Sequence, residues 1–150
     1  MKVPYNYLPS QFEDFDSYIP DLRELVASGE FTLGPFVEKF EKKFAEFVGV
    51  KHAIGTNTGT GALTIALKSV GAGPGTEVIT VANTFIATVG AIVDTGALPV
   101  FVDCDERYQI DVTKIEKAIS KKTKVILPVH WGGASPDMNK ICKIARFVVD

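Results

Sequence analysis

The hydrophobic residues follow one pattern in the first 50 residues and a different pattern after them. In residues 15–26, apolar side chains recur every three or four positions, which predicts an amphipathic helix. Residues 35–48 show the same period more strongly, with Glu and Lys opposite the apolar face. Pro35 and Gly49 are typical of the start and the end of such a helix. We expect a helical N-terminal segment over residues 1–50, whose phenylalanine stripe lies in the core: Phe36, Phe40, Phe44 and Phe47.

From residue 51 onward, short apolar strands alternate with helices. Strands that are apolar throughout, such as residues 125–129, are typical of strands buried on both faces. The alternation predicts an α/β fold with a mostly parallel sheet and helices on both of its faces. The expected strands are 52–57, 76–81, 98–105, 123–130 and 147–150, and the expected helices are 58–71, 83–97, 112–120 and 136–145.

The last expected connection is unusually short. The helix of residues 136–145 runs into the strand of residues 147–150 through Arg146 alone. A helix-to-strand connection normally takes about 2–6 residues. Either the last segment is not a strand, or residues are missing from the sequence at this point.

Composition excludes several classes of protein. Of 150 residues, 46% are hydrophobic and 23% charged, which is typical of a globular protein. Lys and Arg number 16 against 18 Asp and Glu, and this balance argues against nucleic acid or an anionic membrane as partner. The N-terminus has no signal-peptide pattern, and no apolar run approaches the roughly 20 residues of a membrane span. We therefore expect a cytoplasmic protein.

The residue types that bind metals are not clustered. Cys104 and Cys142 form no CxxC pair and no zinc-type spacing with the histidines, so both are expected to be reduced thiols. Asp103 and Asp105 have no third ligand near them in the sequence and are interpreted as strand-end and turn residues. No metal site is predicted.

Ligands of parallel α/β sheets lie at the carboxyl ends of the strands, so the loops after strands are the candidate sites. The first of these loops contains Thr58, Gly59 and Thr60 directly before a helix. Small residues, hydroxyl groups and the helix dipole suit a phosphate group. The alternative is a plain turn with Thr as the helix N-cap. A dinucleotide fingerprint is disfavoured because Thr64 stands at the third glycine position, and no Gly-Lys-Ser/Thr of a P-loop follows.

Two further loops carry candidate residues. In residues 82–88, Phe85 can lie flat on a planar ligand ring, or it can belong to the core. In residues 128–137, His130 can donate or accept a proton beside flexible glycines, or it can satisfy nearby backbone groups. Asp137 in the same loop is a candidate cap of the next helix.

Taken together, these stretches resemble the DegT/StrS-type family of sugar aminotransferases. The resemblance runs from VPYN to FVVD and includes ASGEFTLGPFVEKFEKKFAEFVGVKHAIG, GTNTGTGALTIAL, GAGPGTEVITVANTFIATVGAI, GALPVFVDCD and PVHWGGASPDM. It implies the large α/β domain of the aspartate-aminotransferase type (fold type I), a pyridoxal 5'-phosphate cofactor and a homodimer. On this basis, residues 51–150 are the first part of the cofactor-binding domain.

The resemblance also implies roles for individual residues. Gly59 and Thr60 match the pair that holds the cofactor phosphate, with Thr58 beside them, and Phe85 matches the aromatic that stacks on the pyridine ring. Gly34 belongs to a segment, Thr32–Pro35, that resembles a loop near the active site. His130 lies in a motif close to the cofactor.

Two functional parts of the family are not found in these 150 residues. The lysine that forms the Schiff base lies downstream of the motifs seen here. An aspartate that pairs with the pyridine nitrogen belongs to an acidic pair at the end of the strand that FVVD resembles. Asp150 matches the first member of that pair and would be the functional one only if the pair is shortened. We expect the chain to be the N-terminal portion of a longer protein that adds the rest of the large domain and a small domain.

The function that these observations predict is transfer of an amino group, from glutamate, to a nucleotide-linked keto-deoxysugar. Such products feed lipopolysaccharide, glycan or antibiotic sugars. A sugar dehydratase of the same fold is an alternative, and so is a non-catalytic α/β module that binds a phosphate-bearing ligand. A nicotinamide-dependent oxidoreductase ranks lower because of Thr64 and the neutral run of residues 79–85.

Overall fold

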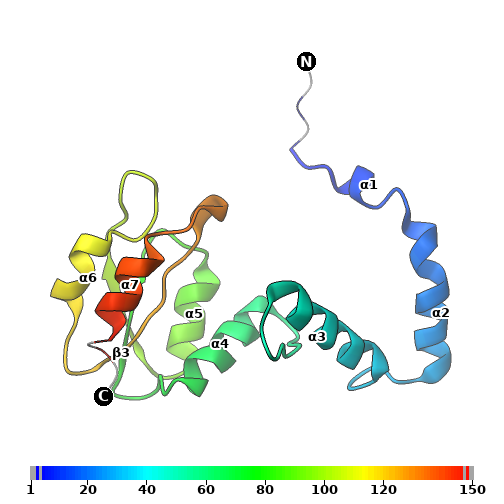
Figure 1. Ribbon diagram of the computed structural model, residues 1–150, viewed down its shortest axis with the longest axis horizontal. Helices are drawn as coiled ribbons and strands as arrows, with labels where there is room; N and C mark the ends of the chain where they lie inside the picture. The colour runs from blue at the N-terminus through cyan, green and yellow to red at the C-terminus, as the bar shows by residue number, and fades with distance from the viewer. Residues whose placement is uncertain (1–2, 4, 147, 149–150) are drawn as a thin grey trace. The chain divides into compact units, whose positions relative to one another are not determined.

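A computed structural model describes residues 3, 5–146 and 148 of the chain (Figure 1). Contacts divide it into two compact units, residues 1–55 and residues 56–150.

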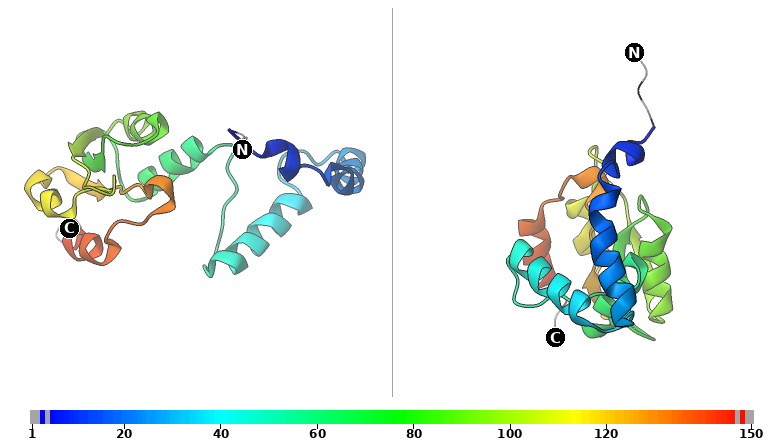
Figure 2. Two further views of the ribbon diagram at one scale, coloured as in Figure 1. Left: turned by 90° about the horizontal axis from the view of Figure 1, so that it is seen from above. Right: turned by 90° about the vertical axis from the view of Figure 1, so that its right-hand side faces the viewer.

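The first unit consists of helices, as its hydrophobic pattern predicts. They are α1 (Leu8–Gln11), the 3-10 helix η1 (Phe15–Tyr18), α2 (Ile19–Ser28) and α3 (Pro35–Val48), of which α2 and α3 are the blue and cyan helices of Figure 2. α3 begins at Pro35, and it ends at Gly49, whose φ of 77° is in the left-handed region that glycine adopts easily. Both predicted ends of this helix are confirmed.

The prediction that the phenylalanine stripe of α3 lies in the core is wrong for the described chain. Phe47 is 87% exposed, Phe40 is 57% exposed, and the rings of Phe40 and Phe44 lie 5.5 Å apart. Of the residues of α3, Ala45 is buried. An amphipathic helix buries its apolar face only where another element packs on it, and the sequence pattern does not show whether that element is within the same 150 residues.

The second unit is a parallel sheet with helices on both faces, which confirms the predicted fold class. Within the described residues the strand order is β2-β1-β3, and β1 pairs in parallel with both neighbours. The strands are β1 (Glu77–Val81), β2 (Leu98–Val102) and β3 (Thr123–Ile126), and the helices are α4 (Gly59–Ser69), α5 (Ile86–Asp94), α6 (Val112–Ala118), α7 (Met138–Ala145) and the 3-10 helix η2 (Trp131–Gly133).

Two of the expected strands, residues 52–57 and residues 147–150, are not among the three strands of the described sheet. The prediction of a strand at residues 52–57 is wrong, because this segment has no ladder partner among the described residues and forms no strand. Apolar alternation marks a segment that can pair, but pairing also needs an adjacent strand edge. The strand expected at residues 147–150 lies outside the described residues except for Val148, which is buried and donates its N–H to the carbonyl of Ala145.

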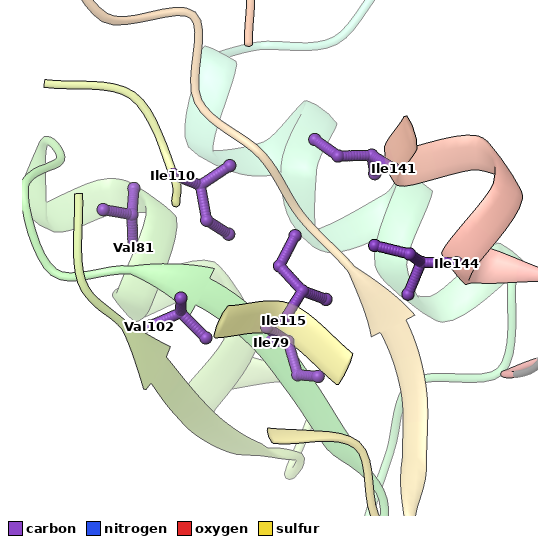
Figure 3. Close-up of a cluster of buried hydrophobic side chains, with 7 residues drawn as sticks. All are labelled: Ile79, Val81, Val102, Ile110, Ile115, Ile141 and Ile144. Carbon is purple, nitrogen blue, oxygen red and sulfur yellow. The ribbon is translucent and has the colours of Figure 1, made fainter. Parts of the chain in front are cut away.

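The sheet separates two apolar layers. On one face, Ile79 and Val81 of β1 pack against α6 and α7, and Figure 3 shows this cluster with its seven buried side chains. On the other face, Val78 packs against α4 and α5. Successive side chains of a strand point to opposite faces, so β1 serves both layers, with Val78 on one face and Ile79 and Val81 on the other. Its residues Val78 and Ile79 are both 0% exposed.

The chain leaves the two neighbouring strands β1 and β3 toward opposite faces of the sheet. After β1 the chain continues into α5, which packs with α4, whereas after the adjacent β3 it continues into α7 on the other face. In open α/β sheets, the crevice outside the carboxyl ends of two such strands is where ligands bind. The loops that follow β1 and β3 therefore border the candidate site. Within the described residues, no helix is long and apolar enough to cross a membrane.

Candidate functional site

The first candidate loop ends at the N-terminus of α4. Thr58 is the N-cap: its Oγ1 accepts a hydrogen bond from the Gly61 N–H at 3.0 Å, and its carbonyl accepts one from Ala62 N–H at 3.0 Å. Thr58 is thus a helix N-cap, as one of the two interpretations of this loop expects. Because the Thr58 oxygen is an acceptor in this contact, its own hydroxyl proton is still able to bond a ligand oxygen.

Within the described residues, the next two backbone N–H groups of α4 make no hydrogen bond. Neither Gly59 nor Thr60 donates its N–H to an acceptor in the described part of the chain. A Cβ built on Gly59 would meet nothing within 4 Å, so a ligand can approach this backbone closely. Residues 70–76 connect the C-terminus of α4 to the start of β1, so the N-terminus of α4 is the end of the helix farther along the chain from that start. Unbonded N–H groups at the positive end of a helix dipole form an anion site.

The second loop presents Phe85 to the surface. Phe85 is 72% exposed and is the residue directly before α5, so the alternative that it belongs to the core is wrong for the described chain. The Oγ1 atoms of Thr84 and Thr88 lie 2.8 Å apart, which links the loop residue before Phe85 to the first turn of the helix after it. The backbone that carries the ring is therefore held in place while the ring face is free for a planar ligand.

The third loop follows β3. The Leu127 N–H donates to the Ile79 carbonyl, and the Thr80 hydroxyl donates to the Leu127 carbonyl at 2.9 Å, so the beginning of the loop is fixed to β1. His130 is exposed, and its side chain makes no hydrogen bond within the described residues. The alternative that His130 satisfies nearby backbone groups is therefore not supported. Its carbonyl accepts the Gly133 N–H at the turn of η2.

At the end of the third loop, Asp137 is held by a hydrogen bond and an ion pair to Lys140. Asp137 caps α7 by accepting the Lys140 N–H at 3.1 Å, as the sequence predicts, and its other oxygen lies 3.2 Å from the Lys140 ammonium. The backbone hydrogen bond first, and the Lys140 side chain second, hold the pKa of Asp137 below its ordinary value. A charged carboxylate at the N-terminus of α7 also interacts favourably with the positive end of the helix dipole.

A set of residues that sequence analysis did not single out joins the second and third loops. Gln109, in the connection between β2 and α6, is 1% exposed, and its Nε2 donates to the Trp131 carbonyl at 3.0 Å. The neighbouring Tyr108 carbonyl accepts from Asn83 Nδ2 at 3.4 Å. The only sequence signal is the closely spaced Asp103 and Asp105, which mark a turn but not a buried amide.

The other candidates are placed as follows. Asp105 accepts backbone N–H groups of its own turn, as expected for a turn residue, and in the described part of the chain no group of three or more His, Cys, Asp or Glu could hold a metal. Gly34 is buried in the first unit, where a Cβ would lie 3.0 Å from the Glu30 Cβ. The remaining candidates lie in the second unit, except Asp150, which is outside the described residues.

Comparison with known proteins gives concordant matches. The model of the DegT/DnrJ/EryC1/StrS aminotransferase family matches residues 14–148. The chain is 49% identical over 129 residues to the spore coat polysaccharide biosynthesis protein SpsC of Bacillus subtilis, covering 85% of the chain and 33% of that protein. It is 47% identical over 116 residues to the GDP-perosamine synthase of Caulobacter vibrioides, covering 77% of the chain and 31% of that protein.

A solved structure agrees over almost the whole chain. The crystal structure of NtdA from Bacillus subtilis with bound cofactor PMP matches with a TM-score of 0.92 and 39% identity, covering 99% of the chain and 35% of that protein. The chain thus spans about a third of the length of these relatives.

Proposed function

Because the chain belongs to the DegT/DnrJ/EryC1/StrS aminotransferase family, we propose that its protein transfers an amino group to the keto group of a nucleotide-linked sugar, with pyridoxal phosphate as cofactor. The observation that carries this proposal is the N-terminus of α4, where the N–H groups of Gly59 and Thr60 are unbonded in the described chain and no side chain covers Gly59. This arrangement fits the phosphate group of the cofactor.

The second requirement of the cofactor is an apolar face for its ring, and Phe85 fits it. The ring of Phe85 is 72% exposed, and Phe85 lies in the loop that follows β1. The carboxyl end of β1 borders the point where the connections after β1 and β3 go to opposite faces of the sheet. When bound, pyridoxal phosphate supplies an electron sink for the bonds at the carbon that carries the amino group. The residues of this chain then have the tasks of binding and orienting it.

Three sets of residues bind and orient the cofactor in this proposal. Gly59 and Thr60 bind the phosphate with backbone N–H groups, and the Thr58 and Thr60 hydroxyls add donors beside them. Phe85 limits the tilt of the ring and excludes water from one of its faces. His130, exposed and without a side-chain partner among the described residues, is a candidate for contacting the bound substrate or cofactor from the third loop.

The substrate class rests on the relatives. The GDP-perosamine synthase is named for a nucleotide-linked amino sugar, and SpsC for biosynthesis of a polysaccharide. We include in the proposal glutamate as amino donor, a role in glycan or lipopolysaccharide sugar synthesis, a cytoplasmic location and a homodimer. The family resemblance alone makes Gly34, in the segment that resembles an active-site loop, and Asp150, if the acidic pair is shortened, candidate residues in this proposal.

The test uses the full-length protein incubated with pyridoxal phosphate, reduced with borohydride and weighed by intact-mass spectrometry. One covalent cofactor per chain is expected, since borohydride fixes the link between the cofactor and its lysine. Unreduced protein is then mixed with glutamate and a panel of nucleotide-linked keto-deoxysugars, and 2-oxoglutarate is measured. Pyridoxal without phosphate serves as the matched control and should bind more weakly.

The outcomes separate the candidate functions. Formation of 2-oxoglutarate together with an amino sugar supports the proposal. Loss of a sugar hydroxyl without amino transfer would indicate a dehydratase. A protein that takes up no cofactor and consumes no glutamate would contradict the proposal and favour a non-catalytic module that binds a phosphate-bearing ligand.

A further inference from the structure

The connection between β2 and α6 is a tightly bonded turn at the carboxyl end of the sheet. Cys104 and Ile110 form an isolated antiparallel bridge, and the Asp105 N–H donates to the Gln109 carbonyl at 2.7 Å. Oδ1 of Asp105 accepts the N–H groups of Arg107 and Gln109 at 2.9 and 3.0 Å. We call residues 103–111 the clamp turn. Hydrogen bonds within the turn thus fix much of its shape.

The clamp turn holds one residue in an uncommon backbone conformation. Tyr108 has a φ of 62°, in the left-handed region, which is a genuine outlier for a bulky side chain. Such conformations persist where the surroundings over-determine them, and they concentrate at functional sites. Here the Tyr108 N–H donates to the Asp105 carbonyl, and the Tyr108 carbonyl accepts from Asn83. Asn83 is two residues before Phe85, so the turn is bonded to the loop that carries the proposed ring platform.

The clamp turn is bonded to the third loop through the side-chain amide of Gln109. Nε2 donates to the Trp131 carbonyl at 3.0 Å and to the Arg107 carbonyl at 3.3 Å. Two carbonyl oxygens at these distances require the NH₂ side of the amide to face them, which settles its orientation. The contact spans 22 residues of sequence. Trp131 directly follows His130, so one turn is bonded to both loops that border the candidate site.

The carbonyl oxygen of the Gln109 amide, Oε1, indicates that this residue does more than fill space. Oε1 of Gln109 is buried and accepts no hydrogen bond within the described residues. A buried acceptor without a donor is destabilising, and an apolar side chain of the same shape can be neutral or stabilising. If the position only filled space, an apolar residue would serve it better than an amide. The amide therefore points to a requirement for the bond to the Trp131 carbonyl.

We propose, on the basis of the proposed function, that Gln109 is a positioning residue of this site: its amide fixes the Trp131 carbonyl and with it the loop that carries His130. The clamp turn then sets the separation of the Phe85 loop and the His130 loop, between which the cofactor and the sugar are bound. A shift of about 1 Å in such a group can lower activity by up to about 10²-fold.

The test compares variants of Gln109 in the full-length protein loaded with pyridoxal phosphate. Gln109→Met keeps the length of the side chain and removes both polar atoms. Gln109→Glu keeps the shape but places a carboxylate oxygen against two carbonyls. Gln11→Met and Gln11→Glu, at an exposed position in α1, are the matched controls. The measurements are the thermal midpoint, kcat and KM for the sugar substrate, and the visible circular dichroism of the bound cofactor.

We expect Gln109→Met to keep the thermal midpoint of the wild type while kcat/KM falls by about 10-fold or more and the cofactor dichroism changes. Gln109→Glu should lower both stability and kcat/KM, and the Gln11 variants should match the wild type. A Gln109→Met protein with wild-type kcat, KM and dichroism would overturn the inference. If Gln109→Met does not fold, Gln109→Asn replaces it in the test, because its side chain is one methylene too short to reach both carbonyls. The same kinetic and spectral measurements then support or overturn the inference.

The result also separates this inference from the proposed function. A wild-type protein that binds no cofactor contradicts the function itself. A wild type that is active, with Gln109 variants that are equally active, contradicts only the positioning role.

Discussion

A Cβ built on Gly61 would lie 2.8 Å from Oδ1 of Asn57, closer than real Cβ contacts come. At Gly59, two residues earlier in the same loop, a Cβ would meet nothing within 4 Å. The two glycines of the GTG sequence thus have different reasons to be small. At Gly61 the protein itself needs the space, whereas at Gly59 the space is open to a ligand.

Alanine substitutions should distinguish these reasons. Gly59→Ala should leave the thermal midpoint unchanged or slightly raised, because alanine suits a helix better than glycine, while the affinity for pyridoxal phosphate falls. Gly61→Ala should raise the thermal midpoint less than this gain in helix propensity alone predicts, because the end of the flexible Asn57 side chain must move to make room for the methyl group. Thermal unfolding and cofactor titration of both variants check this. If Gly59→Ala bound the cofactor as the wild type does, the phosphate would not lie against Gly59.

Thr60→Ala should weaken cofactor binding without unfolding α4. The loss of one charge-assisted hydrogen bond corresponds to on the order of 1–3 kcal/mol in binding free energy. The matched control is Thr64→Ala, one turn later in α4, where the hydroxyl donates to the Thr60 carbonyl at 3.1 Å. Equilibrium dialysis with pyridoxal phosphate measures both variants, and equal affinities for the two would remove the Thr60 hydroxyl from the phosphate site.

Phe85→Ala should reduce cofactor affinity more than protein stability. Stacking of aromatic rings contributes about 0.5–1.5 kcal/mol beyond burial, which corresponds to a loss of up to about 10-fold in affinity. Because Phe85 is 72% exposed, its removal leaves no cavity in the core. Phe85→Tyr should retain affinity, and Phe12→Ala, at an exposed phenylalanine of the first unit, should have no effect. Fluorescence titration with pyridoxal phosphate tests the series, and an unchanged Kd for Phe85→Ala would exclude the ring from the site.

The cap of α7 should make stability depend on pH at the acidic end. The folded-state pKa of Asp137 is lowered from its ordinary value of 3.8 by the Lys140 backbone N–H and then by the Lys140 side chain. A lowered pKa means that the carboxylate contributes stability above about pH 3.8, and that this contribution is lost as pH falls through the lower folded-state value.

Asp137→Asn keeps a side chain that can cap the helix but removes the ionisation. The difference in unfolding free energy between wild type and variant should therefore be constant above the ordinary pKa and shrink below it. Denaturant unfolding at a series of acidic pH values measures this difference. A difference that stays constant through this range would show that the charge of Asp137 does not contribute.

Much of the fold followed from local patterns in the chain. The helical period and the Pro35 and Gly49 signals located α3, and the apolar runs located β1, β2 and β3, because these features depend on residues that are neighbours in sequence. The same local reasoning predicted the helix caps at Thr58 and Asp137, since N-caps use side chains within a few residues of the backbone they bond.

What depended on distant parts of the chain was decided by the tertiary structure. The order β2-β1-β3, which leads the chain to opposite faces after β1 and β3, arises from pairing between strands far apart in sequence. Pairing also decided against a strand at residues 52–57, and packing left Phe40 and Phe47 exposed and buried Gln109. Burial depends on which surfaces meet, and a residue's own neighbours in the sequence do not specify that. The sequence by itself thus determined most of the elements and the residue types of their loops, and only long-range packing determined which strands are neighbours and on which face of the sheet each helix lies.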